Sequence, residues 1–345
     1  MTVHVGLIGG GNISGTHARA ATAIPDVKIA AVYGANHEKV ARLCKEFGGH
    51  PYHDFLSFLA HRPMQMVIIG SPSGLHAEQG MAAARRGLHV LVEKPIDITA
   101  QRADALIKEC EKAKVKLGVI FQDRFKPDIL RLKQLVTDGA LGRLLLADAR
   151  VKWFRPPEYY SGSRWRGSWS LDGGGALMNQ GVHTVDLLLW LLGEVASVRA
   201  RTTTLLHRIE TEDTALALLE FVNGAVGVLE ATTAAYPGYP RRIELTGTEG
   251  TIVLEHDRIV AADVKGSRQD ISSSEPCDQN LSASSPLVTD SRGHQSAIED
   301  FIRAIDENGT PACDGSEGRR SVALIESIYR AACTPERNVK VFVTQ

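Results

Sequence analysis

The first third of the chain alternates short apolar runs with segments in which apolar residues recur at helical spacing. Runs that are almost continuously apolar are typical of strands buried on both faces of a sheet. The predicted strands cover residues 4–9, 28–34, 64–72, 89–95 and 116–121, and the predicted helices cover residues 14–24, 37–48, 75–87 and 99–114. Strands that alternate with helices of this length predict an α/β domain with a parallel, doubly wound sheet over residues 1–122.

After residue 122 the pattern changes, because strand-like runs follow one another without helices between them. The predicted strands cover residues 144–154, 195–206, 213–221, 225–235, 241–248, 251–256 and 258–263, and helices are predicted over 127–139, after the glycines at 173–175, and over 294–309 and 317–334. Consecutive strands without crossover helices predict a mainly antiparallel sheet in a second, α+β domain over residues 123–345. Residues 265–292, rich in Ser, Asp and Pro, are predicted to be a surface loop.

The composition is that of a globular protein, with 43% hydrophobic and 23% charged residues in a chain of 345. The net charge of −1 offers no basic patch for nucleic acid or for an anionic membrane surface. The five cysteines include no CxxC pair, so neither a metal site nor a disulfide framework is predicted, and a cytoplasmic, reducing location is expected. No signal peptide or membrane span is expected, since the apolar run 187–192 is too short to cross a bilayer.

A glycine-rich turn follows the first predicted strand and opens the first predicted helix. It contains Gly9, Gly11, Asn12, Ile13 and Ser14. Gly9 allows a tight turn, Gly11 allows a pyrophosphate to approach the backbone, and Ser14 is small enough for close packing of helix on strand. The free N–H groups at the start of the helix can bind the pyrophosphate. The turn therefore predicts a dinucleotide-binding (Rossmann) domain for NAD or NADP, against the alternative of a glycine-rich turn without a ligand.

The end of the second predicted strand lacks the carboxylate that usually binds the adenosine ribose hydroxyls. Gly34 and Ala35 stand at that place, and His37 and Lys39 follow. A carboxylate there would repel the 2′-phosphate of NADP, so its absence favours NADP over NAD. His37 and Lys39 are candidates to face that phosphate, and the alternative is that they are solvated residues at the start of a helix.

The fourth predicted strand ends in Glu93-Lys94-Pro95. Ligands of doubly wound sheets bind outside the carboxyl ends of the strands, so Lys94 is expected where nicotinamide and substrate meet. A lysine there can hydrogen-bond a substrate hydroxyl, and with a lowered pKa it can take part in proton transfer. A solvated surface lysine is the alternative. The other residues expected to line the cofactor at this edge are Gly34, Ser71, Pro72, His76, Glu93 and Gln122.

Three polar residues follow the glycines at 173–175, in a segment predicted to be a buried helix. Asn179 and His183 are four residues apart and Asp186 follows three residues later, so all three would project from one side of that helix. Buried polar groups need partners, so the three are expected to share a cavity or network. The glycines are expected to let a ligand or a neighbouring backbone approach closely. A purely structural histidine is the alternative.

Residues 153–169 form a segment rich in aromatic and basic side chains. Its candidate substrate-binding residues are Trp153, Arg155, Tyr159, Arg164 and Trp165. Aromatic rings can stack on a sugar or a uracil, and Arg can bind a carboxylate or diphosphate through two parallel hydrogen bonds. The alternative is a loop that packs on a neighbouring subunit.

In this order along nearly the whole chain, these segments resemble the Gfo/Idh/MocA oxidoreductase family. The resemblance is carried by Gly9–Ser14, the Glu-Lys-Pro triplet, GGGxLxxxGxHxxD over 173–186, SPSGLHAE (71–78), RFKP (124–127) and GALGRL (139–144). It implies a Rossmann domain followed by an α+β domain with a large open sheet, whose outer face forms dimers or tetramers. It also implies that a sugar or cyclitol carbon is oxidised or reduced with bound NAD(H) or NADP(H). Lys94 and His183 take the places of the catalytic residues, with a cis Lys94–Pro95 bond.

The chain departs from the family's pattern at Asn179, where most members carry Asp. An amide can orient a substrate hydroxyl but cannot accept a proton, so His183, supported by Lys94, is the expected base. A neutral histidine of ordinary pKa would make activity rise between about pH 6 and about pH 7. The Asn and the segments VKWFRPPEYY and WRGSW most resemble the UDP-N-acetylglucosaminuronate 3-dehydrogenases of the family, which oxidise the C3 hydroxyl of a hexose. That branch also contains 3-dehydrogenases of free sugars and glycosides.

The leading hypothesis is thus an NAD(P)-dependent oxidation of a secondary hydroxyl, at C3, of a sugar, glycoside or nucleotide-sugar. One alternative is a glycosidase or lyase that oxidises C3 transiently with a tightly held cofactor, so that no net NAD(P)H accumulates. Another is a cofactor-binding regulator without catalysis, against which the intact Lys94 and His183 argue. The sequence leaves open which sugar is bound and in which direction the reaction runs.

Overall fold

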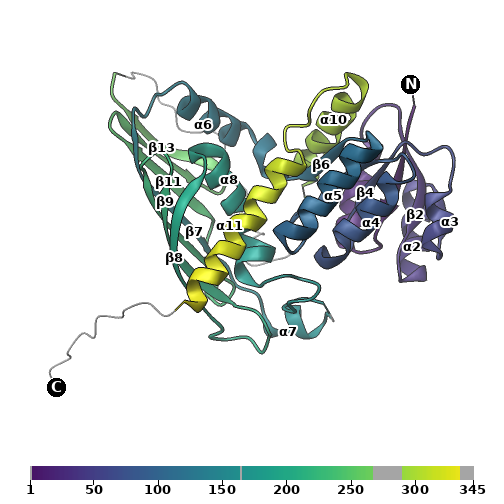
Figure 1. The fold of residues 1–345 in the computed structure, drawn as a ribbon, viewed down its shortest axis with the longest axis horizontal. Coiled ribbons are helices and arrows are strands. Elements are labelled where there is room, and N and C mark those ends of the chain that lie inside the picture. The colour runs from purple at the N-terminus through teal and green to yellow at the C-terminus, as the bar shows by residue number, and fades with distance from the viewer. Residues whose placement is uncertain (1, 164, 267–289, 335–345) are drawn as a thin grey trace.

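The computed structural model describes residues 2–163, 165–266 and 290–334 of the chain (Figure 1). Of the features predicted from the sequence, Arg164 and most of the loop at 265–292 lie outside the described residues. No helix within the described ranges is both long and apolar enough to cross a bilayer.

Six parallel strands form the N-terminal sheet, in the order β3-β2-β1-β4-β5-β6. They are β1 (Val3–Ile8), β2 (Val27–Tyr33), β3 (His50–Tyr52), β4 (Met66–Ile69), β5 (His89–Glu93) and β6 (Leu117–Ile120), and the helices between them are α1 (Asn12–Thr22), α2 (His37–Phe47), α3 (Phe55–Leu59), α4 (His76–Ala84) and α5 (Ala100–Ala113). All residues of β4 and β6 are buried, which explains their continuous apolar runs. The predicted doubly wound sheet is confirmed. The short β3 and α3 are not among the predicted elements, because so few residues carry no readable period.

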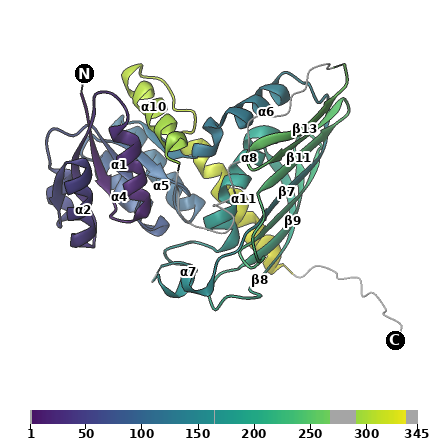
Figure 2. The ribbon, with the colours of Figure 1, turned by 180° about the vertical axis from the view of Figure 1, so that it is seen from behind.

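A helix from far along the chain completes one face of this sheet. Helix α10 (Arg292–Asp306) packs against α1, β5 and β6, and Figure 2 shows it beside α1. Its buried residues Ala297, Ile298 and Phe301 share a core with Val5 and Leu7 of β1. A segment that follows the second sheet in sequence thus lies on the first sheet in space, and the domain boundary near residue 122 stays a prediction.

Seven strands form the second sheet, in the order β13-β12-β11-β7-β10-β9-β8. They are β7 (Leu144–Lys152), β8 (Val195–Thr203), β9 (Thr214–Phe221), β10 (Val226–Thr232), β11 (Arg242–Gly247), β12 (Gly250–Glu255) and β13 (Arg258–Val264). Neighbouring strands are antiparallel except β7 and β10, so the predicted, mainly antiparallel sheet is confirmed.

Three helices cover the face of the second sheet that is turned toward the N-terminal sheet (Figures 1 and 2). They are α6 (Pro127–Thr137), α8 (Val182–Leu192) and α11 (Gly315–Cys333). Among the described residues no helix lies on the opposite face (Figure 2). Helix α11 joins the two halves, because it packs against β8 and α8 on one side and against α5 and β6 on the other. The carboxyl edge of the N-terminal sheet is thereby fixed against the inner side of the second sheet.

The packing of α10 on the N-terminal sheet gives a test of the fold. Phe301 is fully buried, and a Cβ built on Gly118 of β6 would lie 2.7 Å from its ring. Replacing Phe301 by Ala should lower the free energy of unfolding by about 3–5 kcal/mol, measured by urea-induced unfolding followed by circular dichroism. The control is Leu130→Ala on α6, where the side chain is 47% exposed and the expected loss is below about 1 kcal/mol. Equal losses in the two variants would contradict the docking of α10.

Candidate active site

The glycine-rich turn at the carboxyl end of β1 leaves room for an anion. Gly9 has a φ of +130°, and a Cβ there would lie 2.7 Å from the carbonyl oxygen of Gly70, so only glycine fits. A Cβ on Gly11 would meet nothing within 4 Å, and Gly11 and Asn12 are both exposed. Helix α1 has neither a side-chain cap nor an acidic residue in its first turn, so its free N–H groups can bind phosphate. These residues fit the pyrophosphate of a dinucleotide.

Other predicted cofactor residues lie along the same edge of the sheet. Gly34 packs on the glycine turn, since a Cβ there would lie 3.1 Å from a backbone nitrogen of the turn. Gln122 Oε1 and Ser14 Oγ are buried without a hydrogen-bond partner, which leaves Gln122 available to a ligand. Ser71 donates a hydrogen bond within the chain, and Pro72 opens the short turn after β4.

His76 lies behind this edge and is only 1% exposed. Its Nδ1 lies 2.8 Å from the carbonyl oxygen of Pro95, and its Nε2 lies 3.0 Å from that of Ser71. It therefore ties the Lys94–Pro95 turn, whose peptide bond is cis as the resemblance implies, to the loop after β4. A direct contact of His76 with the cofactor stays a prediction.

Glu93 is buried between two histidines. Its Oε1 lies 2.8 Å from His17 Nε2 and 3.6 Å from His294 Nε2. Burial would raise the pKa of Glu93, but the contacts from His17 and His294 hold it well below its ordinary value. The three side chains are close enough to hold a metal ion. However, Nδ1 of both histidines is buried without a partner, whereas metal-bound histidines usually donate that N–H. We interpret the group as a hydrogen-bond network that fixes Glu93 between α1 and α10.

Lys94 extends from the end of β5 into the second half of the molecule. Its Nζ donates a hydrogen bond of 2.8 Å to the backbone carbonyl of Asn179. Burial lowers the pKa of Lys94, and the charges of Glu93, Asp172 and Asp123 oppose that shift. The ammonium group therefore lies in the field of three carboxylates.

His183, in the first turn of α8, faces Asp123. Its Nδ1 lies 3.7 Å from Asp123 Oδ2 and makes no hydrogen bond. Burial, and then the charge of Lys94, lower the pKa of His183 to about 3. The imidazole is neutral at ordinary pH, as a general base must be. The sequence-based expectation that titration of His183 makes activity rise between about pH 6 and about pH 7 is therefore wrong, because this histidine does not have an ordinary pKa.

Asp123, which is buried, belongs to a cluster of four charges with Lys126, Arg241 and Asp257. Lys126 Nζ and Arg241 Nη1 each lie 2.8 Å from a carboxylate oxygen of Asp123, and both side chains also contact Asp257. Burial would raise the pKa of Asp123, but Lys126 and Arg241 hold it well below its ordinary value. Asp123 therefore presents a negative charge to the Nδ1 side of His183.

Asn179 lies in a π-helical turn, Ala176–Gly181, directly before α8. Its Nδ2 donates to Asp172 Oδ1 at 2.5 Å, and its Oδ1 accepts from Gln180 Nε2 at 2.8 Å. The other oxygen of Asp172 accepts from the backbone N–H of Gly167 at 2.8 Å. Burial raises the pKa of Asp172 to about 6. A second carboxylate thus lies against the amide at position 179.

The glycines at 173–175 pack against the protein itself. Cβ atoms built at the three positions would lie 2.5, 2.1 and 1.7 Å from atoms of Ile98, Tyr329 and Glu212 in turn. The expected close approach of neighbouring protein groups is confirmed, and the expected approach of a ligand to these glycines stays a prediction.

The carboxylate of Glu212 anchors the start of the π-helical turn. It accepts hydrogen bonds from the backbone N–H groups of Gly175 at 3.0 Å and Leu177 at 2.8 Å, and from the hydroxyl of Tyr329 at 3.0 Å. Burial raises the pKa of Glu212 to about 7.

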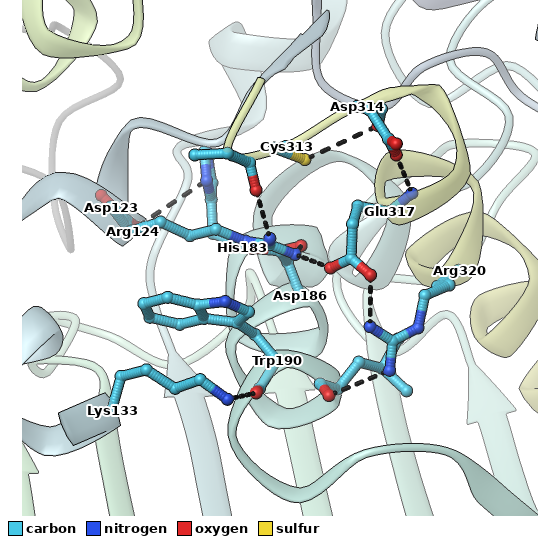
Figure 3. Close-up of polar contacts among 12 residues, drawn as sticks. Asp123, Arg124, Lys133, His183, Asp186, Trp190, Cys313, Asp314, Glu317 and Arg320 are labelled. Carbon is cyan, nitrogen blue, oxygen red and sulfur yellow. Dashed lines mark hydrogen bonds and ion pairs between the residues drawn. The ribbon is translucent and has the colours of Figure 1, made fainter. Parts of the chain in front are cut away.

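Asp186 pairs with Arg124 and not with Asn179. Its two oxygens accept hydrogen bonds of 2.6 and 2.8 Å from the guanidinium of Arg124, which also contacts Glu317 at 3.0 Å (Figure 3). The expectation that the three share one network is therefore wrong, because His183 and Asp186 meet the turn after β6, whereas Asn179 meets Asp172. The physical reason is the π-helical turn, whose wider winding takes Asn179 out of register with α8. The alternative of a shared cavity stays a prediction.

Three of the predicted substrate-binding residues stack on one another next to Asn179. The guanidinium of Arg155 lies 5.2 Å from the centre of the Trp153 ring and 5.7 Å from that of Tyr159. It also donates to Gln180 Oε1 at 2.9 Å. Gln180 Nε2 donates in turn to the Tyr159 hydroxyl and to Asn179 Oδ1, at 3.0 and 2.8 Å. The loop is therefore hydrogen-bonded to the turn that Lys94 contacts.

The remaining predicted residue of this loop, Trp165, stacks on a neighbouring guanidinium, and Arg164 lies outside the described residues. Asp123 and Asp172 are candidate functional residues that the sequence did not reveal. Each carried a signal, because Asp123 directly follows Gln122 at the end of a buried strand and Asp172 directly precedes the glycine run.

Comparison with known proteins places this geometry in a family. Residues 3–121 match the family model described as an oxidoreductase family with an NAD-binding Rossmann fold, and residues 129–253 match that of the GFO/IDH/MocA C-terminal domain. The structure of the WlbA dehydrogenase from Bordetella pertussis, in complex with NADH and UDP-GlcNAcA, superposes with a TM-score of 0.85 at 33% identity, over 96% of this chain and 97% of that one. Levoglucosan dehydrogenase of Pseudarthrobacter phenanthrenivorans is 29% identical over 96% of each chain, and inositol 2-dehydrogenase of Rhizobium meliloti is 26% identical over 96% of this chain and 97% of its own.

The N-terminal Rossmann sheet, the lysine at its carboxyl edge and the second, mainly antiparallel sheet together define the class of protein, an NAD-binding oxidoreductase. The chain belongs to the Gfo/Idh/MocA family, a family of NAD-dependent dehydrogenases of sugars and polyols.

The buried Arg124–Asp186 pair provides a test of how the helix that bears His183 is held. Asp186→Ala leaves the guanidinium of Arg124 without its main partner and should lower the free energy of unfolding by about 3–5 kcal/mol in urea denaturation. Asp306→Asn, at an exposed site on α10, is the control and should change it by less than about 0.5 kcal/mol. The double variant Arg124→Met/Asp186→Leu, which buries no unpaired charge, should regain part of the loss. A double variant no more stable than Asp186→Ala would count against the pair.

Proposed function

We propose that the chain oxidises a secondary hydroxyl of a sugar at C3, with His183 as the base and Lys94 as hydrogen-bond donor to the reacting oxygen. The observation that carries the proposal is the side chain of Lys94, held 2.8 Å from the carbonyl of Asn179, together with a buried His183 whose pKa is lowered to about 3 by burial and then by the charge of Lys94. Support comes from the similarity to a dehydrogenase whose structure contains NADH and UDP-GlcNAcA and to levoglucosan dehydrogenase.

In this reaction the substrate carbon loses a hydride and its hydroxyl loses a proton. Bound NAD⁺ or NADP⁺ supplies the hydride acceptor at nicotinamide C4. His183 takes the proton on Nε2, and the ionised Asp123 on its Nδ1 side stabilises the imidazolium that forms. The charge of Lys94 stabilises the negative charge that develops on the substrate oxygen in the transition state.

Replacing Lys94 tests the assignment directly. Lys94→Ala should lower kcat/KM by about 100-fold or more, because both the hydrogen bond and the positive charge are lost. The dissociation constant of NADH, measured by fluorescence titration, should stay within about threefold, since the phosphates bind at the other end of the cofactor. Lys112→Ala, on the exposed side of α5, is the control for loss of a lysine. Wild-type turnover by Lys94→Ala would refute the proposal.

The substrate class and the cofactor are tested together by one panel of UDP-sugars, free hexoses and glycosides, each with NAD⁺ and NADP⁺. The stacked Trp153, Arg155 and Tyr159 favour a substrate with a flat or anionic extension, such as a nucleotide-linked sugar. NADP is proposed because Gly34 and Ala35, and not a carboxylate, directly follow β2. In addition, Lys39 borders the glycine turn, since a Cβ built on Gly10 would lie 3.5 Å from the Cβ of Lys39. Net formation of NADH or NADPH supports the dehydrogenase. Sugar products without net reduced cofactor would instead support transient oxidation within a glycosidase or lyase.

The uncovered face of the second sheet is proposed as the surface of a homodimer or homotetramer. Leu146, Leu216, Leu218 and Val226 on this face are each 46–56% exposed. Exposed apolar side chains gathered on one sheet face are typical of protein–protein interfaces. A cytoplasmic location, expected from the cysteines, stays a prediction.

Charges on this face should disrupt the assembly. The double variant Leu216→Glu/Leu218→Glu should have the mass of a monomer by light scattering coupled to size exclusion, whereas the wild type should have at least twice that mass. Leu205→Glu, at a 71% exposed position beyond the end of β8, is the control. An unchanged mass in the double variant would contradict the proposed interface.

A further inference from the structure

Asp172 is a buried carboxylate for which neither the resemblance nor the proposed reaction provides a role. It is 1% exposed and lies seven residues before Asn179, directly ahead of the glycine run. Both its oxygens are held, Oδ1 by Asn179 Nδ2 at 2.5 Å and Oδ2 by the backbone N–H of Gly167 at 2.8 Å. A carboxylate buried to this degree is costly unless it is paired, so its environment should supply a positive charge.

The side-chain amide of Asn179 is held at both ends by the protein. Its Nδ2 donates to Asp172 and its Oδ1 accepts from Gln180, so its orientation is fixed. One N–H and one oxygen lone pair remain for a sugar hydroxyl. Because a carboxylate only accepts hydrogen bonds, the amino end must point toward Asp172. The side chain of Asn179 thus binds the carboxylate of Asp172, and its backbone carbonyl binds Lys94.

Lys94 and Asp172 both contact Asn179, Lys94 at the backbone carbonyl and Asp172 at the side-chain amide. Burial lowers the pKa of Lys94, and the charge of Asp172 is among those that raise it again. Burial raises the pKa of Asp172 to about 6, and the charge of Lys94 is among those that lower it. The other charged or titratable groups that act on one or both of the two are Arg166, Tyr159, Tyr160, Glu93, Asp123, Arg155 and His183.

We propose that Asp172 is a positioning residue for the reaction, whose carboxylate keeps Lys94 charged and in place. The negative charge then comes from the loop before the glycines, while position 179 carries an amide that binds that carboxylate. This inference rests on the proposed function, since it acts through Lys94.

The expected pH dependence of kcat follows from the ionisation of Asp172, because only the ionised carboxylate stabilises the ammonium group of Lys94. The effect of Asp172 on Lys94 is present above the pKa of Asp172 and is lost as the pH falls through about 6. His183, with a pKa lowered to about 3, does not titrate in that range. An acid limb of kcat near pH 6 in the wild type therefore reports on Asp172.

Three variants separate the charge from the fold. In Asp172→Asn, kcat on UDP-GlcNAcA and on levoglucosan should fall about 100-fold with KM within about threefold, and the acid limb near pH 6 should disappear. In Asn179→Asp, two carboxylates meet and share a proton, so the acid limb should move to higher pH. The double variant Asp172→Asn/Asn179→Asp restores a carboxylate–amide pair and should recover at least about tenfold of the loss in kcat. Asp306→Asn is the control for loss of a surface carboxylate.

A second measurement needs no substrate. The lysine Cε resonances of the uniformly ¹³C-lysine-labelled, full-length protein report the protonation of Lys94, which is assigned by its absence in Lys94→Ala. The apparent pKa of Lys94 should fall in Asp172→Asn and recover in the double variant. Unchanged titration of Lys94 in Asp172→Asn, or a double variant no more active than Asp172→Asn, would overturn the proposal. Wild-type turnover by Lys94→Ala would instead refute the proposed function, and the titration result would stand separately.

Discussion

The hydrogen bond from Lys94 Nζ to the carbonyl oxygen of Asn179 joins two parts of the chain that are 85 residues apart. One end, Lys94, directly follows the last residue of β5 in the N-terminal sheet, and the other is a π-helical turn on the inner side of the second sheet. For the bond to hold one geometry, both ends must be rigid. Glu93, fixed by His17, and His76, bonded to Pro95, hold the strand end. Glu212 and Asp172 hold the turn through hydrogen bonds to its backbone N–H groups and to its Asn179 side chain.

The electrostatics of the site follow from burying unlike charges close together. Burial lowers the pKa of Lys94, and the charges of three carboxylates oppose that shift. Burial, and then the charge of Lys94, lower the pKa of His183 to about 3, so that His183 is neutral. Lys126 and Arg241 hold the pKa of Asp123 well below its ordinary value, so that its negative charge faces the Nδ1 side of His183. The proposed proton transfer to His183 depends on that charge, which would stabilise an imidazolium.

Local pattern was enough to predict most of the architecture. The continuous apolar runs of β4 and β6, the glycine turn after β1 and the strand-end Lys94 all lie within short segments whose environment is set by their neighbours in sequence. The positions that escaped prediction depend on remote partners. Helix α10 has an ordinary amphipathic pattern, and nothing in it says that its buried face, with Phe301, meets β1 and not the sheet that precedes it. The prediction that Asn179, His183 and Asp186 share one side of a helix assumed α-helical winding. Because residues 176–181 form a π-helical turn, the predicted direction of Asn179 was wrong. Asp123 and Asp172 stand in loops, where a carboxylate is ordinary, and only the structure brings them beside His183 and Asn179.

The same arrangement explains why the glycine run and the polar residues after it belong together. Glycines at 173–175 let Glu212, Tyr329 and Ile98 pack closely against the start of the turn, and the turn presents the carbonyl of Asn179 to Lys94. A crystal structure with NADH and a sugar that the protein turns over would test this account most directly. It should place one secondary hydroxyl oxygen of the sugar within about 3.2 Å of both Lys94 Nζ and His183 Nε2, with the carbon that bears it facing nicotinamide C4. A sugar bound with its hydroxyls away from Lys94 and His183 would contradict it.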